Sequence, residues 1–270
     1  LTAIATWTKT PPVNGKRILW LVTLWSIARI IIYLPFQYRF LYSLIFSQLF
    51  FLFAVIFAAQ PIFKTHNKRN YLVPVALALL GLAELLFYLG LTRRIMAIPL
   101  FSLQAGLLVV AAFMSLVGGR VIPLFTKNTT QLPTYRSPFI IMATFLIPIV
   151  IAILILLPHT QLLVLPLGVI YAALAYFQLF KSFNRKVLLH PLLWILFIGY
   201  FFAVLGVFTA SFAYSFNTMR YFTLSNHLIA VGGIGCLTLG MMTRSALGHT
   251  GRRIKLPPFA VGSYYMVVIS

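Results

Sequence analysis

The sequence predicts an all-α protein, a polytopic bundle of transmembrane helices. The 270 residues are 61% hydrophobic and 8% charged, so a water-soluble fold would have too few polar side chains to cover its core. The apolar residues form runs long enough to cross a bilayer, and the basic residues are clustered between these runs. The lipid bilayer is therefore the expected solvent and partner of the chain.

Eight segments are expected to span the bilayer completely. A helix needs roughly 20 apolar residues to cross the hydrocarbon, because its backbone polar groups must be satisfied within the span. The segments of that length are, in order, 18–35, 42–63, 71–91, 95–117, 138–157, 161–180, 189–213 and 221–243. Partial spans are expected at 1–8 and from about 257 onward. The longest loop, 118–137, is too short to fold separately, so residues 1–270 are expected to form a single transmembrane domain.

The distribution of lysine and arginine supports each of these boundaries. The positive-inside rule requires basic residues in every second loop if the spans are counted correctly. Sixteen lie in one set of loops: Lys9, Lys16, Arg17, Lys64, Lys68, Arg69, Arg120, Lys127, Arg136, Lys181, Arg185, Lys186, Arg244, Arg252, Arg253 and Lys255. Four lie in the loops between them: Arg39, Arg93, Arg94 and Arg220. The loops 9–17, 64–70, 118–137, 181–188 and 244–255 are therefore expected to face the cytoplasm.

Composition and motifs argue against several function classes. A net charge of +20 would suggest nucleic acid on a soluble domain, but here the basic residues flank spans, so no nucleic-acid partner is expected. The chain has no paired carboxylates, Walker loop, CxxC, HExxH or nucleophile elbow, which disfavours hydrolytic and phosphoryl-transfer enzymes. The one cysteine, Cys236, lies in an apolar run and is expected to serve packing.

Both ends of the sequence are expected to be incomplete. The chain opens with LTAI rather than an initiator methionine, and no signal peptide follows, so an N-terminal part is expected to be missing. The last residues, YYMVVIS, form an apolar run shorter than a span.

Two ionisable residues lie inside predicted spans, where a charge is expensive and needs a partner. Arg29 lies twelve residues beyond Arg17, and Glu84 lies thirteen beyond Tyr71, both on helices that run outward. Their depths therefore match. A structural Arg29–Glu84 ion pair is the favoured interpretation, and a proton-relay carboxylate is the alternative.

His227 is the best candidate ligand among the five histidines. It lies about six residues into its span from the outer side, among apolar neighbours. A neutral imidazole is a common ligand of heme iron, copper and zinc, although a histidine hydrogen-bonded across a helix interface is about equally compatible with the spacing. The glycines that follow, at 232, 233, 235 and 240, could admit a flat macrocycle or simply a second helix.

The same helix ends in a polar stretch, MMTRSALGHTGR. Its His249 could ligate a metal, or could bind an anion together with Arg244 and Arg252; the alternative is a basic helix end that faces lipid headgroups. Met241 and Met242 could bind copper but are more often packing residues. His190, before Pro191, is expected to cap a helix at the interface, and His66 and His159 are expected to be solvated in loops.

Several stretches resemble the NnrS family of bacterial membrane proteins. Residues 226–252, NHLIAVGGIGCLTLGMMTRSALGHTGR, resemble the family's signature of a histidine, a glycine-rich helix, MTR and LGHTGR. The stretches GGRVIPLFT at 118–126, HPLLW with GY at 190–200, RNY at 69–71 and LTAIATWTKTPPVNG at 1–15 are similar to further family motifs in the same order. The resemblance covers nearly the whole chain.

The resemblance implies a heme- and copper-containing protein of the bacterial inner (cytoplasmic) membrane, tied to nitric oxide and protective under denitrifying or nitrosative conditions. It implies His227 and His249 as candidate heme or metal ligands, and Arg244 and Arg120 as candidate propionate or anion contacts. Two departures stand out: the family's histidine-rich N-terminal stretch is absent, and Phe197 stands where the family often has a histidine. A multi-pass permease or channel, and an inactive truncated remnant of the family, are the alternative functions.

Overall fold

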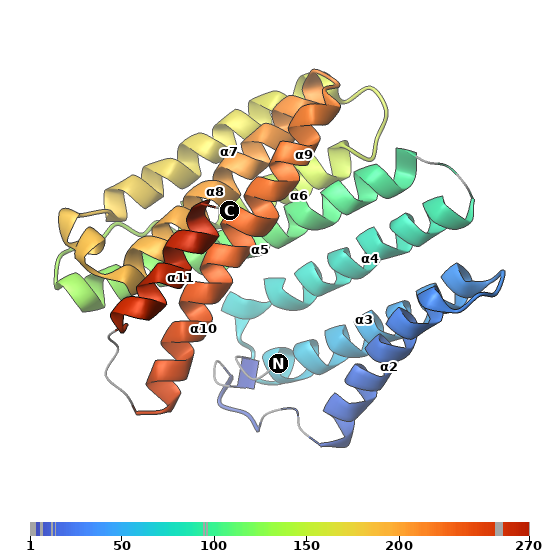
Figure 1. Ribbon diagram of the computed structural model, residues 1–270, viewed down its shortest axis with the longest axis horizontal. Helices are drawn as coiled ribbons and strands as arrows, with labels where there is room; N and C mark the ends of the chain where they lie inside the picture. Colours follow the sequence, from blue (N-terminus) through green and yellow to red (C-terminus); the bar gives the residue numbers. More distant parts are fainter. Residues whose placement is uncertain are drawn as a thin grey trace. The chain divides into compact units, whose positions relative to one another are not determined.

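The computed structural model in Figure 1 describes residues 4–5, 8–11, 13, 15–93, 95, 97–251 and 256–269. These residues form helices and no strand, so the predicted all-α class is confirmed. The helices are α2 (Lys16–Tyr33), α3 (Arg39–Lys64), α4 (Leu72–Thr92), α5 (Ala97–Thr130), α6 (Pro138–Leu154), α7 (Gln161–Ser182), α8 (Pro191–Ser215), α9 (Met219–His227), the π-helix η3 (Leu228–Gly235), α10 (Cys236–His249) and α11 (Pro258–Ile269). Short 3₁₀ turns η1 (Lys68–Asn70) and η2 (Arg185–Leu189) lie in two of the basic loops.

Six helical stretches of the described residues are long and apolar enough to cross a bilayer, so the chain is a multi-pass membrane protein. They are Arg39–Lys64, Leu72–Thr92, Ile98–Thr130, Gln161–Ser182, Pro191–Ser215 and Met219–Gly248. The predicted count of eight is not confirmed. Of the other two expected spans, α6 has only 17 residues, and α2 carries three basic residues within its 18.

The predicted loop 118–137 is wrong over its first half, because α5 continues without a break to Thr130. Within this segment, two adjacent glycines let neighbouring helices approach closely. A Cβ on Gly118 would lie 2.8 Å from Tyr200 Cδ2 of α8. Gln178 Nε2 of α7 donates to the carbonyl oxygen of Gly119 at 3.1 Å. Packing against α7 and α8 therefore holds this segment helical.

The chain divides into two compact units, residues 1–106 and 107–270, and α5 contributes to each. The expectation of a single domain over 1–270 stays a prediction. The helix α11 corresponds to the expected C-terminal partial span, whereas most of the expected N-terminal one, 1–8, lies outside the described residues.

In the first unit, α3 packs against α2 and against α4. Polar side chains join these helices inside the apolar core. Ser43 Oγ of α3 donates to the carbonyl oxygen of Ala28 at 2.9 Å and lies 2.9 Å from the hydroxyl of Tyr88 on α4. Gln48 Nε2 donates to the carbonyl oxygen of Gly81 at 3.0 Å. These bonds fix the register of the three helices.

In the second unit, α8 is the central helix and contacts α7, α9, η3 and α10 (Figure 1). The α6–α7 and α8–α9 connections meet at one end of this unit, where Ser215 Oγ donates to the carbonyl oxygen of Gln161 at 2.8 Å. The two basic connections meet at the other end, where Ser182 Oγ donates to the carbonyl oxygen of Tyr135 at 2.8 Å. The second unit thus has one end rich in basic residues and one end poor in them, which we call the basic end and the opposite end.

Candidate functional site

The candidate ligand helix is one continuous rod made of α9, η3 and α10. The π-helical segment η3 begins at the residue after His227 and ends at Gly235. A π-helix is rare and often accompanies a functional site, because the wider turn displaces the side chains around it. Apart from the run of glycines, no feature of the sequence indicated that residues 228–235 would be π-helical.

His227 is the last residue of α9, at the opposite end of the second unit, and its side chain is exposed. Its Nδ1 lies 2.8 Å from the carbonyl oxygen of Thr223. A carbonyl only accepts, so Nδ1 is the donor in this bond, and in a neutral imidazole Nε2 then keeps its lone pair. This is the arrangement of a metal-ligating histidine, whose second ring nitrogen commonly donates to a backbone carbonyl. The alternative of a hydrogen bond across a helix interface is not what the structure shows, because Thr223 belongs to the same helix.

The glycines of this rod pack against α8. A Cβ on Gly232 would lie 2.7 Å from Phe202 Cβ, and one on Gly240 would lie 2.8 Å from Ile195 Cγ2. Glycines of α8 complement them: a Cβ on Gly206 would lie 2.5 Å from Ile229 Cγ1. The smooth face therefore receives a helix, and of the two interpretations offered by the sequence, helix packing is the one observed.

The rod runs parallel to α5, and residues at a constant offset in the sequence lie side by side along the two helices. A Cβ on Gly233 would lie 3.2 Å from Met114 Cε, and the guanidinium carbon of Arg244 lies 3.8 Å from the centroid of the Phe125 ring. Both pairs are 119 positions apart in the sequence, so the two helices advance together over about three turns. Alternating spans require this parallel direction, since three crossings separate the two helices.

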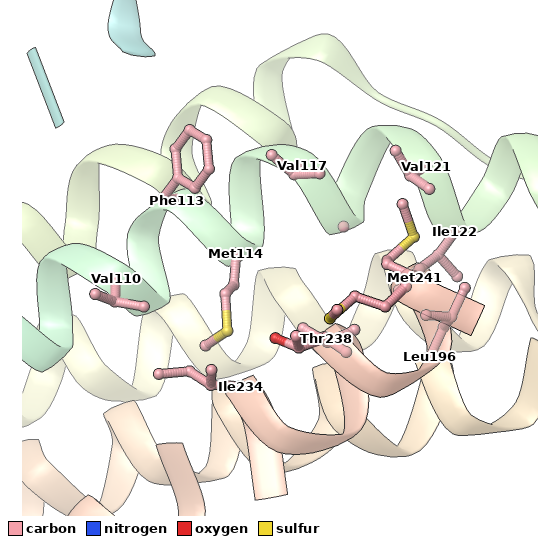
Figure 2. A pocket seen from close by; sticks show the side chains of 13 residues that line it. Val110, Phe113, Met114, Val117, Val121, Ile122, Leu196, Ile234, Thr238 and Met241 are labelled. Carbon is pink, nitrogen blue, oxygen red and sulfur yellow. The ribbon is translucent and has the colours of Figure 1, made fainter. Parts of the chain in front are cut away.

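Between α5 and the rod lies an apolar cavity of about 350 Å³. Figure 2 shows residues of its lining, with Val110, Val117 and Val121 on α5, and with the side chain of Met114 extending from α5 toward Ile234. Met241 and Met242 also line the cavity, and Met242 is 66% exposed. The lining is apolar apart from the hydroxyl of Thr238, so the cavity suits small apolar molecules or acyl chains.

A second cavity, of about 370 Å³, lies at the basic end and holds three polar side chains: Thr129 from α5, His190 at the start of α8 and Arg244 from α10. His190 occupies the N-cap position, as expected, but its side chain makes no capping hydrogen bond. His190 is therefore the N-cap residue, but its imidazole takes no part in the cap and is left for the cavity. Sequence reasoning missed His190 as a site residue, because only the fold brings it to Arg244.

The predicted site residues do not form a single centre. Arg244 is 17 residues beyond His227 on one rod, about 25 Å at 1.5 Å per residue, which is farther than a propionate reaches from its heme iron. Arg120 of α5 is half-buried and, by the register above, lies roughly 18 Å along the bundle from the level of His227. Arg244 is therefore too far along the rod to bind the propionates of a heme held by His227. The side chain of His249 lies outside the described residues, but its backbone is roughly 30 Å along the rod from His227.

The described residues contain no group of three His, Cys, Asp or Glu side chains that could hold a metal ion. Phe197, at the position where a family histidine was expected, is buried and packs its ring 5.7 Å from that of Phe183. His66 and His159 are exposed loop residues with left-handed backbone conformations. His227 is thus the described histidine whose geometry best suits an axial ligand.

The predicted ion pair is present in the first unit. Arg29 Nη2 lies 2.9 Å from Glu84 Oε1, and Ser47 Oγ donates to the same oxygen at 3.1 Å. The second carboxylate oxygen, Oε2, is buried with no hydrogen-bond partner among the described residues. The pair joins α2 to α4, with α3 contributing through Ser47.

Fold and site together define a multi-pass, all-α membrane protein with an exposed histidine that directly precedes the π-helical segment of a glycine-rich span. The chain matches the NnrS protein family over residues 1–270, and it belongs to that family. Comparison with curated proteins and with solved structures gives no match.

Proposed function

We propose that this chain is a heme-binding protein of the bacterial inner membrane that acts in the response to nitric oxide and protects against nitrosative stress. Membership of the NnrS family over the whole chain supports the general role. The single observation that supports a heme site is the geometry of His227, whose Nδ1 is engaged by Thr223 so that Nε2 remains available.

The residues at His227 fit one axial bond to heme iron. The imidazole is exposed on the side of the rod, and the carbonyl of Thr223 accepts from Nδ1, which in a neutral imidazole leaves Nε2 free to ligate. In the neighbouring residue, Asn226 Oδ1 is buried without a hydrogen-bond partner among the described residues, so it can accept a hydrogen bond from a ligand or water. A heme held there would supply an iron to which nitric oxide can bind.

Copper, the second cofactor that the resemblance implies, does not fit the described residues. No three ligating His, Cys, Asp or Glu side chains come together among them. The thioethers of Met114 and Met241 line one cavity, but the lining offers only the Thr238 hydroxyl as a further donor, and copper sites need several strong ligands. We assign no copper site in this part of the chain.

The orientation that best suits the charge distribution places the basic end of the second unit in the cytoplasm. His227, at the opposite end, then lies near the outer face of the membrane. A heme at that depth is reached by nitric oxide from outside the cell, or from the bilayer itself, before the gas enters the cytoplasm.

Absorption spectroscopy of the detergent-purified chain, oxidised and then reduced with dithionite, tests this proposal. We expect a Soret band that His227→Ala removes and that shifts when nitric oxide is added to the reduced protein. The matched controls are His66→Asn and His159→Asn, since asparagine tolerates the left-handed backbone at both positions. A folded, colourless and metal-free wild type contradicts heme binding and favours the inactive remnant or a transporter.

One observation favours transport as the second candidate function. Glu84 lies inside a span with one carboxylate oxygen buried and unpartnered among the described residues, as expected of a group that exchanges a proton. Proton flux into liposomes that contain the chain, abolished by Glu84→Gln, would support a permease. Equal flux in liposomes with the variant would exclude that role for Glu84.

A further inference from the structure

We propose that the cavity at the basic end of the second unit, lined by Thr129, His190 and Arg244, binds a phosphate group. The inference rests on these side chains alone and needs no heme. The cavity measures about 370 Å³, which is the size of a small-ligand pocket. Its three polar side chains come from α5, the start of α8 and α10, three segments that are far apart in the sequence.

Arg244 is the central group of this cavity. Its side chain is half-buried, and its guanidinium carbon lies 3.8 Å from the centroid of the Phe125 ring. This cation–π contact holds the plane of the guanidinium without using its hydrogen-bond donors. No hydrogen-bond acceptor or carboxylate lies on the guanidinium among the described residues, so its N–H groups are available to a ligand.

The two other polar groups of the cavity are available as well. His190 makes no capping bond with its imidazole, and the hydroxyl of Thr129 has no hydrogen-bond partner among the described residues. Both groups are half-buried. Desolvating donors without partners is unfavourable, and a ligand that accepts hydrogen bonds from all three would remove that penalty.

The charge balance requires that the acceptor be an anion from outside the chain. The sequence has one carboxylate side chain, Glu84, and it is paired with Arg29 in the first unit. A planar guanidinium beside a hydroxyl and an imidazole suits the several oxygens of a phosphate, which can take a bidentate pair from arginine. The start of α8 adds the positive end of its helix dipole.

The apolar part of the lining favours a phosphate that carries hydrocarbon. Four leucines share the cavity with the three polar groups, and one of them, Leu189, is 76% exposed. These residues lie where a basic helix end meets the headgroup region in the orientation proposed above. An anionic phospholipid would place its phosphate on Arg244 and its chains along the leucines. A free phosphate ester has the same anionic group without the chains.

Thermal unfolding of the purified full chain in a neutral detergent tests the proposal and separates the two sources. We expect phosphatidylglycerol to raise the unfolding midpoint more than phosphatidylcholine does, and Arg244→Gln to abolish that difference. Arg244→Lys keeps the charge but loses the planar fork, so it should retain part of the effect. Lys127→Gln is the matched control, because Lys127 is exposed on α5 and its replacement removes the same charge outside the cavity.

Inorganic phosphate, added without lipid, distinguishes the sources. A midpoint that rises equally with inorganic phosphate supports a site for free phosphate esters, whereas a rise with phosphatidylglycerol alone supports a lipid site. An equal response to phosphatidylglycerol in wild type and Arg244→Gln overturns the proposal, as does the absence of a response to either probe. Loss of the response in Lys127→Gln as well would also overturn it, because the effect would then follow total charge.

Discussion

Arg29 and Glu84 meet in the first unit with Arg29 Nη2 2.9 Å from Glu84 Oε1, and Ser47 donates to that same oxygen at 3.1 Å. One carboxylate oxygen thus receives two donors while Oε2 has no partner among the described residues. The two side chains differ in burial, since that of Arg29 is 39% exposed and that of Glu84 is 16% exposed. The pair is therefore the main polar link between α2 and α4.

Glu84→Gln should lower the stability of the chain, and adding Arg29→Met should restore most of it. Removing the carboxylate leaves a guanidinium inside the bilayer without a counter-charge. Fully buried pairs lose about 3–5 kcal/mol in this way, and we expect less because Arg29 is partly exposed. The difference in stability between the variants is measured by thermal unfolding in detergent, which is monitored through the loss of the monodisperse peak. Arg93→Gln, an exposed charge, is the control; identical midpoints for the single and double variants would remove the case for pairing.

This ion pair could be predicted from the sequence because a helix rises by a fixed amount per residue. Two spans that start at the same membrane face bring residues of equal count to equal depth, so Arg29 and Glu84 had to lie level. The side-by-side placement of α2 and α4 around α3 was not predictable in this way. Ser47 was missed, since nothing in a single apolar run marks a serine as a second donor.

The phosphate cavity could not be predicted, and the reason is its construction from distant segments. Thr129, His190 and Arg244 come from three helices, and each alone is an ordinary residue at a membrane interface. The helical course of α5 through the two glycines before Arg120 was missed for a related reason. Glycine marks a loop in isolation but a close helix contact in a bundle, and only the neighbours, Tyr200 and Gln178, decide between the two.

Gly206→Ala should be among the most damaging small substitutions in the second unit. The added methyl would lie 2.5 Å from Ile229 Cγ1 and 3.0 Å from the backbone nitrogen of Ile229, and a backbone atom cannot move aside cheaply. Overpacking of this kind destabilises by about 1–3 kcal/mol. Gly262→Ala makes the same chemical change where nothing lies within 4 Å of the new methyl, so its midpoint should not fall. Equal effects of the two variants would mean that α8 and η3 are not in close contact.

The proposed orientation can be checked with a membrane-impermeant maleimide. Cys236 is fully buried, so the wild-type chain should give almost no labelling. Gln161→Cys, at the opposite end of the second unit, should react in intact spheroplasts. Lys186→Cys, at the basic end, should react only after the membrane is permeabilised. Both replaced side chains are exposed, so access to the reagent decides the result. The reverse pattern would place the basic loops outside and would contradict the positive-inside assignment.

The apolar cavity between α5 and the rod can be tested by enlarging two side chains of α5, one that lines the cavity and one that is tightly packed. Val117 lines the cavity, whereas Ala111, on the same helix, is fully buried. Val117→Phe should fill space and gain dispersion contacts, with an unchanged midpoint or a gain of about 1 kcal/mol. Ala111→Phe adds even more bulk where none fits and should lose about 1–3 kcal/mol through overpacking. Thermal unfolding of both variants in one detergent measures this contrast. If Val117→Phe destabilises as much as Ala111→Phe, the space between α5 and the rod is not open in the folded protein.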